Sequence, residues 1–491
     1  MDYRDYLRAG GDAAPQAYGV YPKSIRAAGN AKVFMAREAA RDVLVATGDG
    51  AGLRGETFEG PSGSYIVAPL SHENACALRR LFPFTAPTRV LGRDRSFGVG
   101  DRLGIAAMGH IRVFERYDAY PVLAQQSIRE LDLTCRTYED VLDCVTFIVY
   151  REGYEKGYGA DGDHLKKAAD VEYALRLGYT MITLDCSEHI RADVDALSDD
   201  EVRERYAPDR QLEERYLGKQ FNIGEGVRLT FTPEALRRAA LLYGDAIDFA
   251  AGIYDTYFAR GKADADFEMS IDETATPTTP LQHFFVANEL IRRGVTPATI
   301  APRFCGEFQK GIDYIGDIAR FTQEIEVHCA IARHFGYKIS VHSGSDKFSV
   351  FPVVGEKTRG RFHVKTAGTN WLEAMRVVAQ IDPGLYREVH RFALGAFPEA
   401  TRYYHVTTDI AKIPDIDALR DEELPYLFLD NNARQLIHIT YGLILGARDE
   451  QGAFLFRDRL YALWRDNEQA YADALALHIG RHLDELGVRK I

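Results

Sequence analysis

Short apolar segments that alternate with amphipathic helical segments are the feature that most restricts the fold of this chain. From about residue 88, β-branched or apolar stretches end in polar, glycine-containing loops, and each loop leads into a stretch with helical periodicity. The clearest strand candidates are residues 121–127, 179–185, 266–272, 338–342 and 361–365. Alternation of this kind requires right-handed crossover connections and therefore a parallel sheet.

Three weaker candidates, near residues 97–99, 158–160 and 300–304, bring the number of strands to about eight. Eight strand–helix units favour a closed (β/α)8 barrel of the TIM type over an open, doubly wound sheet. We therefore predict an α/β fold with an N-terminal appendage at 1–87, a catalytic barrel at 88–400 and a mostly helical C-terminal extension at 401–491. The helical end of the extension is typical of packing or of a contact between copies of the chain, so the sequence is compatible with a homo-oligomer.

The bulk composition narrows the class of function. The net charge of -12 argues against broad binding to a nucleic-acid backbone, but it leaves an anionic small molecule open because a few local cations suffice for that. No apolar run approaches the roughly 18 residues needed to cross a bilayer, and the N-terminus lacks the apolar core of a signal peptide. The six cysteines are scattered without a C-x-x-C pair, which is typical of reduced thiols. We expect a cytoplasmic protein that binds neither nucleic acid nor membrane.

Ionisable residues collect at the predicted carboxyl ends of the strands, where barrel enzymes place their reactive groups. The sharpest motif is GYGADGDHLK, in which glycines allow the backbone to turn before the adjacent pair Asp163 and His164. Such a pair can divide two tasks, because the imidazole binds a divalent metal while the carboxylate moves a proton. The alternative is that Asp163 only caps the helix predicted to follow it.

Two further strand ends extend the predicted site. His342 ends the segment ISVH and enters a Ser-Gly-Ser turn whose backbone N–H groups can hold an anionic oxygen, with Lys347 nearby as a positive charge. Glu268 alternates with Ser270 and Asp272 and therefore faces the barrel interior, where an unpaired carboxylate is costly. Glu268 is thus a candidate general acid or base, and the alternative is a buried ion pair.

Side chains for holding a substrate come from the same strand ends. The candidates are Arg102, Gln126, Lys347 and Lys365, of which the three cations are suited to an anionic group. Carboxylates, imidazoles and cations thus converge on one face of the predicted barrel. This convergence predicts an enzyme that acts on a small, negatively charged molecule.

Five long segments of the chain carry a similarity to a known family. They are RSFGVGDRLG (95–104), GYGADGDHLKKAADVEYALRLGYTMITLDCSEHI (157–190), FEMSIDETATPTTPLQHFFVANEL (267–290), APRFCGEFQKGIDYIGD (301–317) and VHSGSDKFSVFPV (341–353). In these segments the chain resembles the tagaturonate epimerase family. These segments span most of the chain between about residues 90 and 375. The resemblance implies a barrel, a divalent metal, a proton acceptor at Asp163 and a proton donor at Glu268.

The Asp-His pair is also similar to that of class II ketose aldolases, in which the Asp accepts a proton and the His holds the metal. In those aldolases a further ligand follows the sixth strand and another His ends the seventh, and His342 matches the latter. The segment CGEFQKG contains no His, so the resemblance implies Gln309 as the third ligand beside His164 and His342, with His283 as the substitute. Ligands of these types suit Mn, Fe, Co, Ni and Zn alike.

The family interconverts tagaturonate and fructuronate, which differ at a carbinol carbon one bond beyond the carbon next to the ketone. Simple enolisation cannot invert that carbon, whereas retro-aldol cleavage followed by re-addition can. The resemblance therefore implies a metal-dependent epimerase of a sugar acid. Two alternatives stay open: a metal-dependent aldolase or lyase that releases the fragments, and a non-catalytic barrel that only binds a sugar acid.

Overall fold

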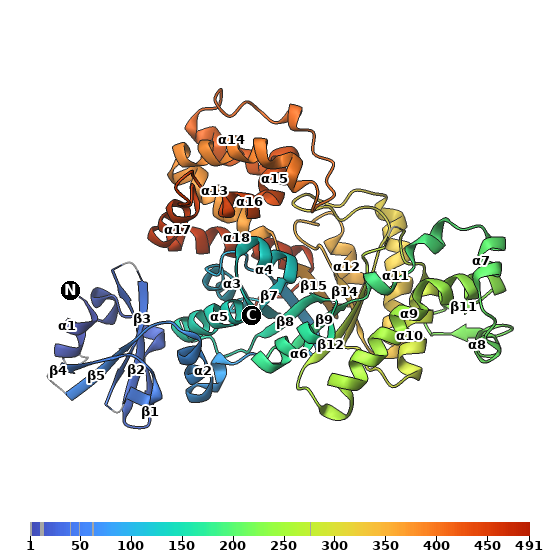
Figure 1. Ribbon diagram of the computed structural model, residues 1–491, viewed down its shortest axis with the longest axis horizontal. Coiled ribbons are helices and arrows are strands. Elements are labelled where there is room, and N and C mark those ends of the chain that lie inside the picture. The colour runs from blue at the N-terminus through green and yellow to red at the C-terminus, as the bar shows by residue number, and fades with distance from the viewer. Residues whose placement is uncertain (1, 10–13, 40, 49, 61–62, 275) are drawn as a thin grey trace.

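A closed barrel of parallel strands forms the centre of the molecule (Figure 1). The computed structural model describes residues 2–9, 14–39, 41–48, 50–60, 63–274 and 276–491. The barrel strands are β6 (Arg95–Val99), β7 (Tyr120–Ser127), β8 (Gly159–Leu165), β9 (Met181–Asp185), β12 (Asp266–Ile271), β13 (Thr299–Pro302), β14 (Lys338–Val341) and β15 (Phe362–Thr366). Each strand pairs in parallel with the next barrel strand along the chain, and β15 closes the barrel on β6. The predicted TIM-type barrel is confirmed.

Helices cover the outside of the barrel, as the crossover connections require. They are α3 (Ala107–Phe114), α4 (Ile128–Thr134), α5 (Tyr138–Glu152), α6 (Ala168–Leu177), α9 (Pro233–Tyr257), α10 (Pro280–Arg292), α11 (Ile318–Phe335), α12 (Phe351–Lys357) and α13 (Thr369–Ile381). Local sequence sets several of their starts: the Thr232 side chain caps α9 ahead of Pro233, and Asp317 caps α11. Apolar residues of the strands and of these helices other than α13 form the largest buried core.

An excursion between β9 and β12 adds small elements at one edge of the barrel. It contains α7 (Asp199–Arg205), α8 (Arg210–Tyr216) and a hairpin of β10 (Gln220–Asn222) and β11 (Arg228–Thr230). Aromatic side chains of this excursion pack against α10, since the Phe221 and Phe284 rings lie 4.8 Å apart. The excursion therefore extends the outer layer of the barrel and does not reach into its interior.

The N-terminal residues form an antiparallel sheet beside the barrel (Figure 1, blue). Its strands run in the order β1 (Arg26–Ala28), β2 (Ala31–Glu38), β3 (Arg41–Thr47), β5 (Gly63–Ala68) and β4 (Glu56–Gly60), with α1 (Tyr3–Arg8) and α2 (His72–Leu81) packed on it. One apolar face of the sheet shares a core with Phe147 and Tyr150 of α5. This shared core attaches the sheet to the outer layer of the barrel, remote from the strand ends that carry chemistry.

The C-terminal residues build a helical layer on one side of the barrel (Figure 1, orange to red). It comprises α14 (Pro383–Ala400), α15 (Asn431–Ile439), α16 (Tyr441–Gly446), α17 (Arg457–Asp466) and α18 (Glu468–Glu485), which share a second large core with α13. Arg434 of α15 reaches the loops at the mouth of the barrel, where it contacts Asp346 Oδ2 at 2.7 Å and the Gly311 carbonyl oxygen at 2.7 Å. The layer thus supports the loops that follow β13 and β14. Among the described residues, no helix combines the length and apolarity that a membrane span requires.

Candidate active site

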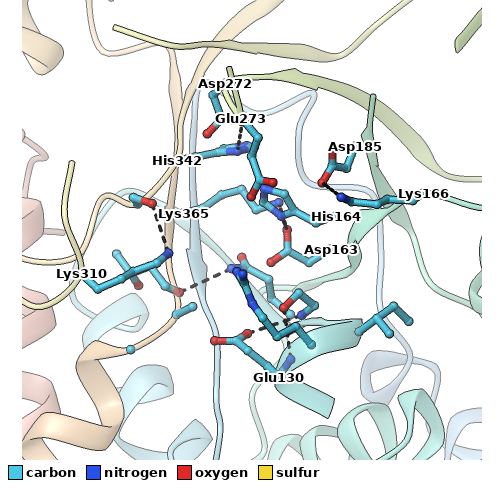
Figure 2. A pocket seen from close by; sticks show the side chains of 18 of the residues that line it. Glu130, Asp163, His164, Lys166, Asp185, Asp272, Glu273, Lys310, His342 and Lys365 are labelled. Atoms are coloured by element: carbon cyan, nitrogen blue, oxygen red, sulfur yellow. Dashed lines mark hydrogen bonds and ion pairs between the residues drawn. The ribbon is translucent and has the colours of Figure 1, made fainter. Parts of the chain in front are cut away.

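A cavity of about 430 Å³ opens at the carboxyl ends of the barrel strands (Figure 2). Its wall includes four predicted site residues that come from three strands, Asp163 and His164 of β8, His342 after β14, and Lys365 of β15. Tyr404, from the segment that follows α14, completes one side. The volume suits a small molecule, and the place is the one that barrel enzymes use for catalysis.

Two imidazoles and one carboxylate meet in this cavity. His164, Asp272 and His342 each offer one ligand atom, and these atoms all lie within 4.8 Å of one another. The two imidazole rings have their centroids 5.0 Å apart. His342 Nδ1 is buried without a hydrogen-bond partner among the described residues, although Asp272 Oδ1 lies 3.3 Å away. Two nitrogens and a carboxylate oxygen around one point are a donor set that fits a divalent transition metal.

Each imidazole also forms a hydrogen bond with a carboxylate through the ring nitrogen that points away from this group of ligand atoms. Asp163 Oδ1 lies 2.7 Å from His164 Nδ1, and Glu268 Oε1 lies 2.7 Å from His342 Nε2. Carboxylates in this position fix the ring orientation and the tautomer of a metal-binding histidine. The arrangement leaves His164 Nε2 and His342 Nδ1 as the nitrogens that face a common ligand.

An irregularity in β8 explains how two adjacent residues both face the cavity. The pairing of β8 with β9 shifts register between Gly162 and Leu165, and His164 has a φ of 57°. A bulge of this kind breaks the alternation of a strand and re-aims a side chain, and a left-handed backbone at a non-glycine residue is typical of functional sites. Because β8 continues to Leu165 and α6 starts only at Ala168, Asp163 does not cap that helix. The capping alternative is therefore wrong.

Lys365 is the shared counter-ion of three buried carboxylates next to the cavity. Its ammonium contacts Asp163, lies 2.7 Å from Asp161 Oδ2 and lies 3.5 Å from Glu268 Oε1. Burial raises the pKa of Asp161 to about 6 despite this lysine. Burial acts in the same direction on Asp163 and Glu268, but the charge of Lys365 and the neighbouring imidazoles together outweigh it and hold the pKa of both carboxyls below its usual range.

The carboxylate beside His342 is Asp272, whose Oδ1 accepts a hydrogen bond from Ser270 Oγ. Although burial favours the neutral ring, Asp272 and Glu268 together raise the pKa of His342 to about 10. Asp272 and Glu268 therefore favour a positive charge in this corner of the cavity, which a bound cation would supply. The site as a whole carries more carboxylates than cations around the two imidazoles.

The two predicted alternatives for a third metal ligand lie in different surroundings. Gln309 lines an adjoining cavity that shares Asp272 and His342 with the first, but its Oε1 accepts hydrogen bonds from Thr407 N, Thr407 Oγ1 and Gln435 Nε2, each at 3.0 Å. These contacts use the lone pairs that a cation would need.

His283 is buried in α10 outside the cavity lining. Its two ring nitrogens contact His328 Nδ1 at 2.9 Å and the Tyr337 hydroxyl at 2.7 Å. The structure thus brings Asp272, and neither of the two alternatives, to the pair of imidazoles in this conformation. The sequence held one signal for Asp272, because this residue shares a strand face with Glu268.

The predicted substrate-binding residues divide into two groups. Arg102 and Lys365 line the cavity, and Arg102 Nε donates to Glu130 Oε1 at 2.9 Å. Gln126 and Lys347 are buried and do not belong to the cavity lining. The Lys347 ammonium instead donates to three backbone carbonyl oxygens, which ties the loop after β14 to the loop after β13. Lys347 therefore has a clear structural task.

Comparisons with known proteins agree over nearly the whole chain. The sequence profile of the tagaturonate epimerase family matches residues 21–486. The chain is 43% identical over 480 residues to the tagaturonate/fructuronate epimerase of Thermotoga maritima, covering 96% of this chain and 97% of that protein. It is 49% identical to the fructuronate-tagaturonate epimerase UxaE of Cohnella laeviribosi, whose crystal structures with one glycerol and in native form match with TM-scores of 0.94 and 0.93 over 99% of this chain and 98% of theirs.

Proposed function

The chain belongs to the tagaturonate epimerase family, and from this premise we propose that it interconverts tagaturonate and fructuronate with a divalent cation at His164, Asp272 and His342. The observation that carries the proposal is the meeting of these three side chains in a cavity at the mouth of the barrel. Epimerisation at a carbinol carbon needs a polarised ketone and a base, and both requirements have candidates here.

The donor set supports a cation at this point. Both imidazoles are oriented by carboxylates, and no described residue forms a hydrogen bond with the buried Nδ1 of His342 that a metal would have to displace. When bound, the cation would act as a Lewis acid that polarises the substrate ketone. Mn, Fe, Co, Ni and Zn all suit nitrogen and carboxylate ligands, so the donor set does not select one of them.

Asp163 is the proton acceptor in this proposal. Its carboxylate lines the cavity and contacts His164 Nδ1 and the Lys365 ammonium. It takes the proton from the hydroxyl on the carbon to be inverted, while the bond between that carbon and the carbon next to the ketone breaks. The electron pair of the broken bond passes toward the ketone, giving an enediolate and an aldehyde. After the aldehyde has turned, the bond re-forms on its other face.

Glu268 is the proton donor in this proposal, but it does not belong to the cavity lining. Its carboxylate contacts His342 Nε2 at 2.7 Å and the Lys365 ammonium at 3.5 Å, and that ammonium also contacts Asp163. The proton that Asp163 takes up therefore has a path to Glu268 by way of the Lys365 ammonium, and Glu268 returns it along this path to the oxygen of the re-formed carbinol. The same carboxylate orients the imidazole of His342.

Epimerisation in deuterated water tests the function and the route together. We expect tagaturonate to give fructuronate without solvent deuterium at the inverted carbon, because bond cleavage and re-addition leave the hydrogen of that carbon in place. NMR of the product pool measures both results, and chelator-treated protein serves as the control. Deuterium at that carbon would contradict the retro-aldol route, free aldehyde in the mixture would favour the lyase alternative, and full activity of chelated protein would contradict the metal.

The identity of the third ligand is tested by a pair of substitutions. We expect Asp272→Asn to lower the affinity for a divalent cation by about 10- to 100-fold or more, because the substitution removes a negative ligand beside His342. We expect Gln309→Ala to leave that affinity within a few-fold of the wild-type value, because the amide oxygen of Gln309 already accepts hydrogen bonds from Thr407 and Gln435. Metal titration of the two purified variants measures the difference. The reverse order of effects would assign the ligand to Gln309.

A further inference from the structure

The cations predicted to hold the substrate carboxylate are already engaged by the protein. The Arg102 guanidinium donates to Glu130, and the Lys347 ammonium is saturated by backbone carbonyls outside the cavity. The Lys365 ammonium serves three carboxylates at once. A sugar acid therefore needs a different positive group on the cavity wall, because a charge buried without a partner is costly.

Lys310, in the loop after β13, lines the cavity and meets no acidic partner. Among the residues that the structure describes, its Nζ donates to Ser343 Oγ at 3.2 Å and lies within ion-pair distance of no carboxylate. Figure 2 places its ammonium in the cavity on the side opposite Asp163 and His164. An ammonium with one hydroxyl partner keeps donor capacity for a ligand, since it carries three protons.

Charges of both signs surround Lys310, and the strongest of them is the positive charge of Arg129. Arg102 acts in the same sense, whereas the carboxylates of Glu130 and Glu273 oppose both. Arg129 lines the same cavity, with its guanidinium 4.9 Å from the centre of the Tyr404 ring, and it too lacks a carboxylate partner among the described residues. Burial and the nearby charge of Arg129 lower the pKa of Lys310. An anion bound beside Lys310 would relieve this repulsion.

The N-terminus of α13 adds a second attraction for an anion. Gly368, at its N-cap, lines the cavity and has no side chain to cap the helix, and within the first turn Asn370 Oδ1 accepts a hydrogen bond from the Trp371 N–H at 2.8 Å. The buried ring of His438 packs against both Gly368 and Gly311, the residue after Lys310, so the helix start and the Lys310 loop are neighbours. Within the part of the chain that the structure describes, neither ring nitrogen of His438 has a hydrogen-bond partner. Unsatisfied backbone N–H groups at a helix start favour a negative group.

We propose that Lys310, beside the N-terminus of α13, binds the substrate carboxylate and thereby selects sugar acids over uncharged ketoses. This inference rests on the proposed function for the identity of the sugar acid. The ketone of the substrate lies at the group formed by His164, Asp272 and His342, and the carboxylate at the other end of the carbon chain meets Lys310. The ammonium attracts the carboxylate of a sugar acid, and a neutral hydroxymethyl group at the same position gains no such attraction.

Calorimetric titration of the metal-loaded enzyme with fructuronate and with fructose tests this contact without relying on turnover. Fructose has the same carbon skeleton with a hydroxymethyl group in place of the carboxylate. We expect Lys310→Met to raise the Kd for fructuronate by about 30-fold or more and to change the Kd for fructose by less than about threefold. Lys310→Arg restores part of the affinity for fructuronate because it keeps the charge.

Lys167→Met is the matched control, since Lys167 lines the same cavity with an exposed side chain. We expect this variant to bind fructuronate within about threefold of the wild type, and all variants to carry the same amount of metal. The inference would be overturned if Lys310→Met lost affinity for fructuronate and for fructose by the same factor, or if its affinity for fructuronate were unchanged. A wild type that binds fructuronate through Lys310 but does not convert it would overturn the proposed function and leave the inference standing.

Discussion

His342→Ala is expected to lower kcat/KM for tagaturonate on the order of 10³-fold or more and to abolish tight binding of a divalent cation. The substitution removes one of the two nitrogens that face the common ligand, and it leaves Glu268 without the imidazole that lies 2.7 Å from its carboxylate. Steady-state kinetics and metal analysis of the same preparation measure both effects. The loss should appear in kcat as well as in KM, because the Lewis acid acts mainly in the transition state.

His283→Gln is the control for this result. His283 is also a buried histidine, but it contacts His328 and Tyr337 outside the cavity. We expect this variant to keep its metal and most of its activity, even if its thermal stability falls. If the His342 variant kept its metal and the His283 variant lost it, the proposed site at His342 would be wrong and the cation would have to bind near His283.

Lys365→Met is expected to destabilise the protein by about 3–5 kcal/mol at neutral pH. The substitution leaves Asp161, Asp163 and Glu268 buried without the ammonium that now contacts all three. Chemical unfolding of chelator-treated wild type and variant measures the difference in the free energy of unfolding. Activity is expected to fall as well, since the link between Asp163 and Glu268 is lost.

The difference made by Lys365→Met should widen as the pH rises. In the wild type the lowered pKa values of Asp163 and Glu268 contribute stability above the usual carboxyl pKa, and this contribution is lost as the pH falls. In the variant, only the neighbouring imidazoles still oppose the effect of burial, so these pKa values rise relative to the wild type and the stabilising contribution above the usual carboxyl pKa shrinks. The difference in the free energy of unfolding between wild type and variant is thus larger at about pH 8 than at about pH 5.

Lys338→Met provides the matched control at the other end of the barrel. The Lys338 ammonium is buried but donates to the Arg93 carbonyl oxygen and to Ser96 Oγ, not to carboxylates. We expect a cost of about 1 kcal/mol, typical of a lost hydrogen bond. Equal costs for the two lysine variants, with the same dependence on pH, would contradict the assignment of Lys365 as the counter-ion of the buried carboxylates.

The barrel was predictable from the sequence because its signals are local. Each strand is a short apolar stretch followed by a polar loop, and the order of such units along the chain decides the order of the strands in the barrel. The same logic places Asp163, His164 and His342 at one mouth, since parallel strands end on the same side.

The contacts among the strand ends were less predictable, because residues far apart in the chain decide them. Gln309 is turned to Thr407 and Gln435, which come from the C-terminal layer, and no pattern near CGEFQKG announces these partners. The shift of register in β8 that turns His164 into the cavity is likewise a property of the assembled sheet. The sequence identifies Asp272 as a carboxylate at a strand end, but the similarity to class II aldolases implies a ligand after the next strand, β13.

The contacts of the C-terminal layer with the mouth of the barrel limit how this enzyme can be shortened or recombined. Arg434 supports the loops after β13 and β14, and Tyr404 forms part of the cavity wall. A truncated chain that ends at residue 400 would retain every barrel strand and the histidines of the proposed metal site, yet the loops around the cavity would lose their outer scaffold. Chimeras between relatives should therefore exchange the barrel loops together with the last 91 residues of the 491-residue chain.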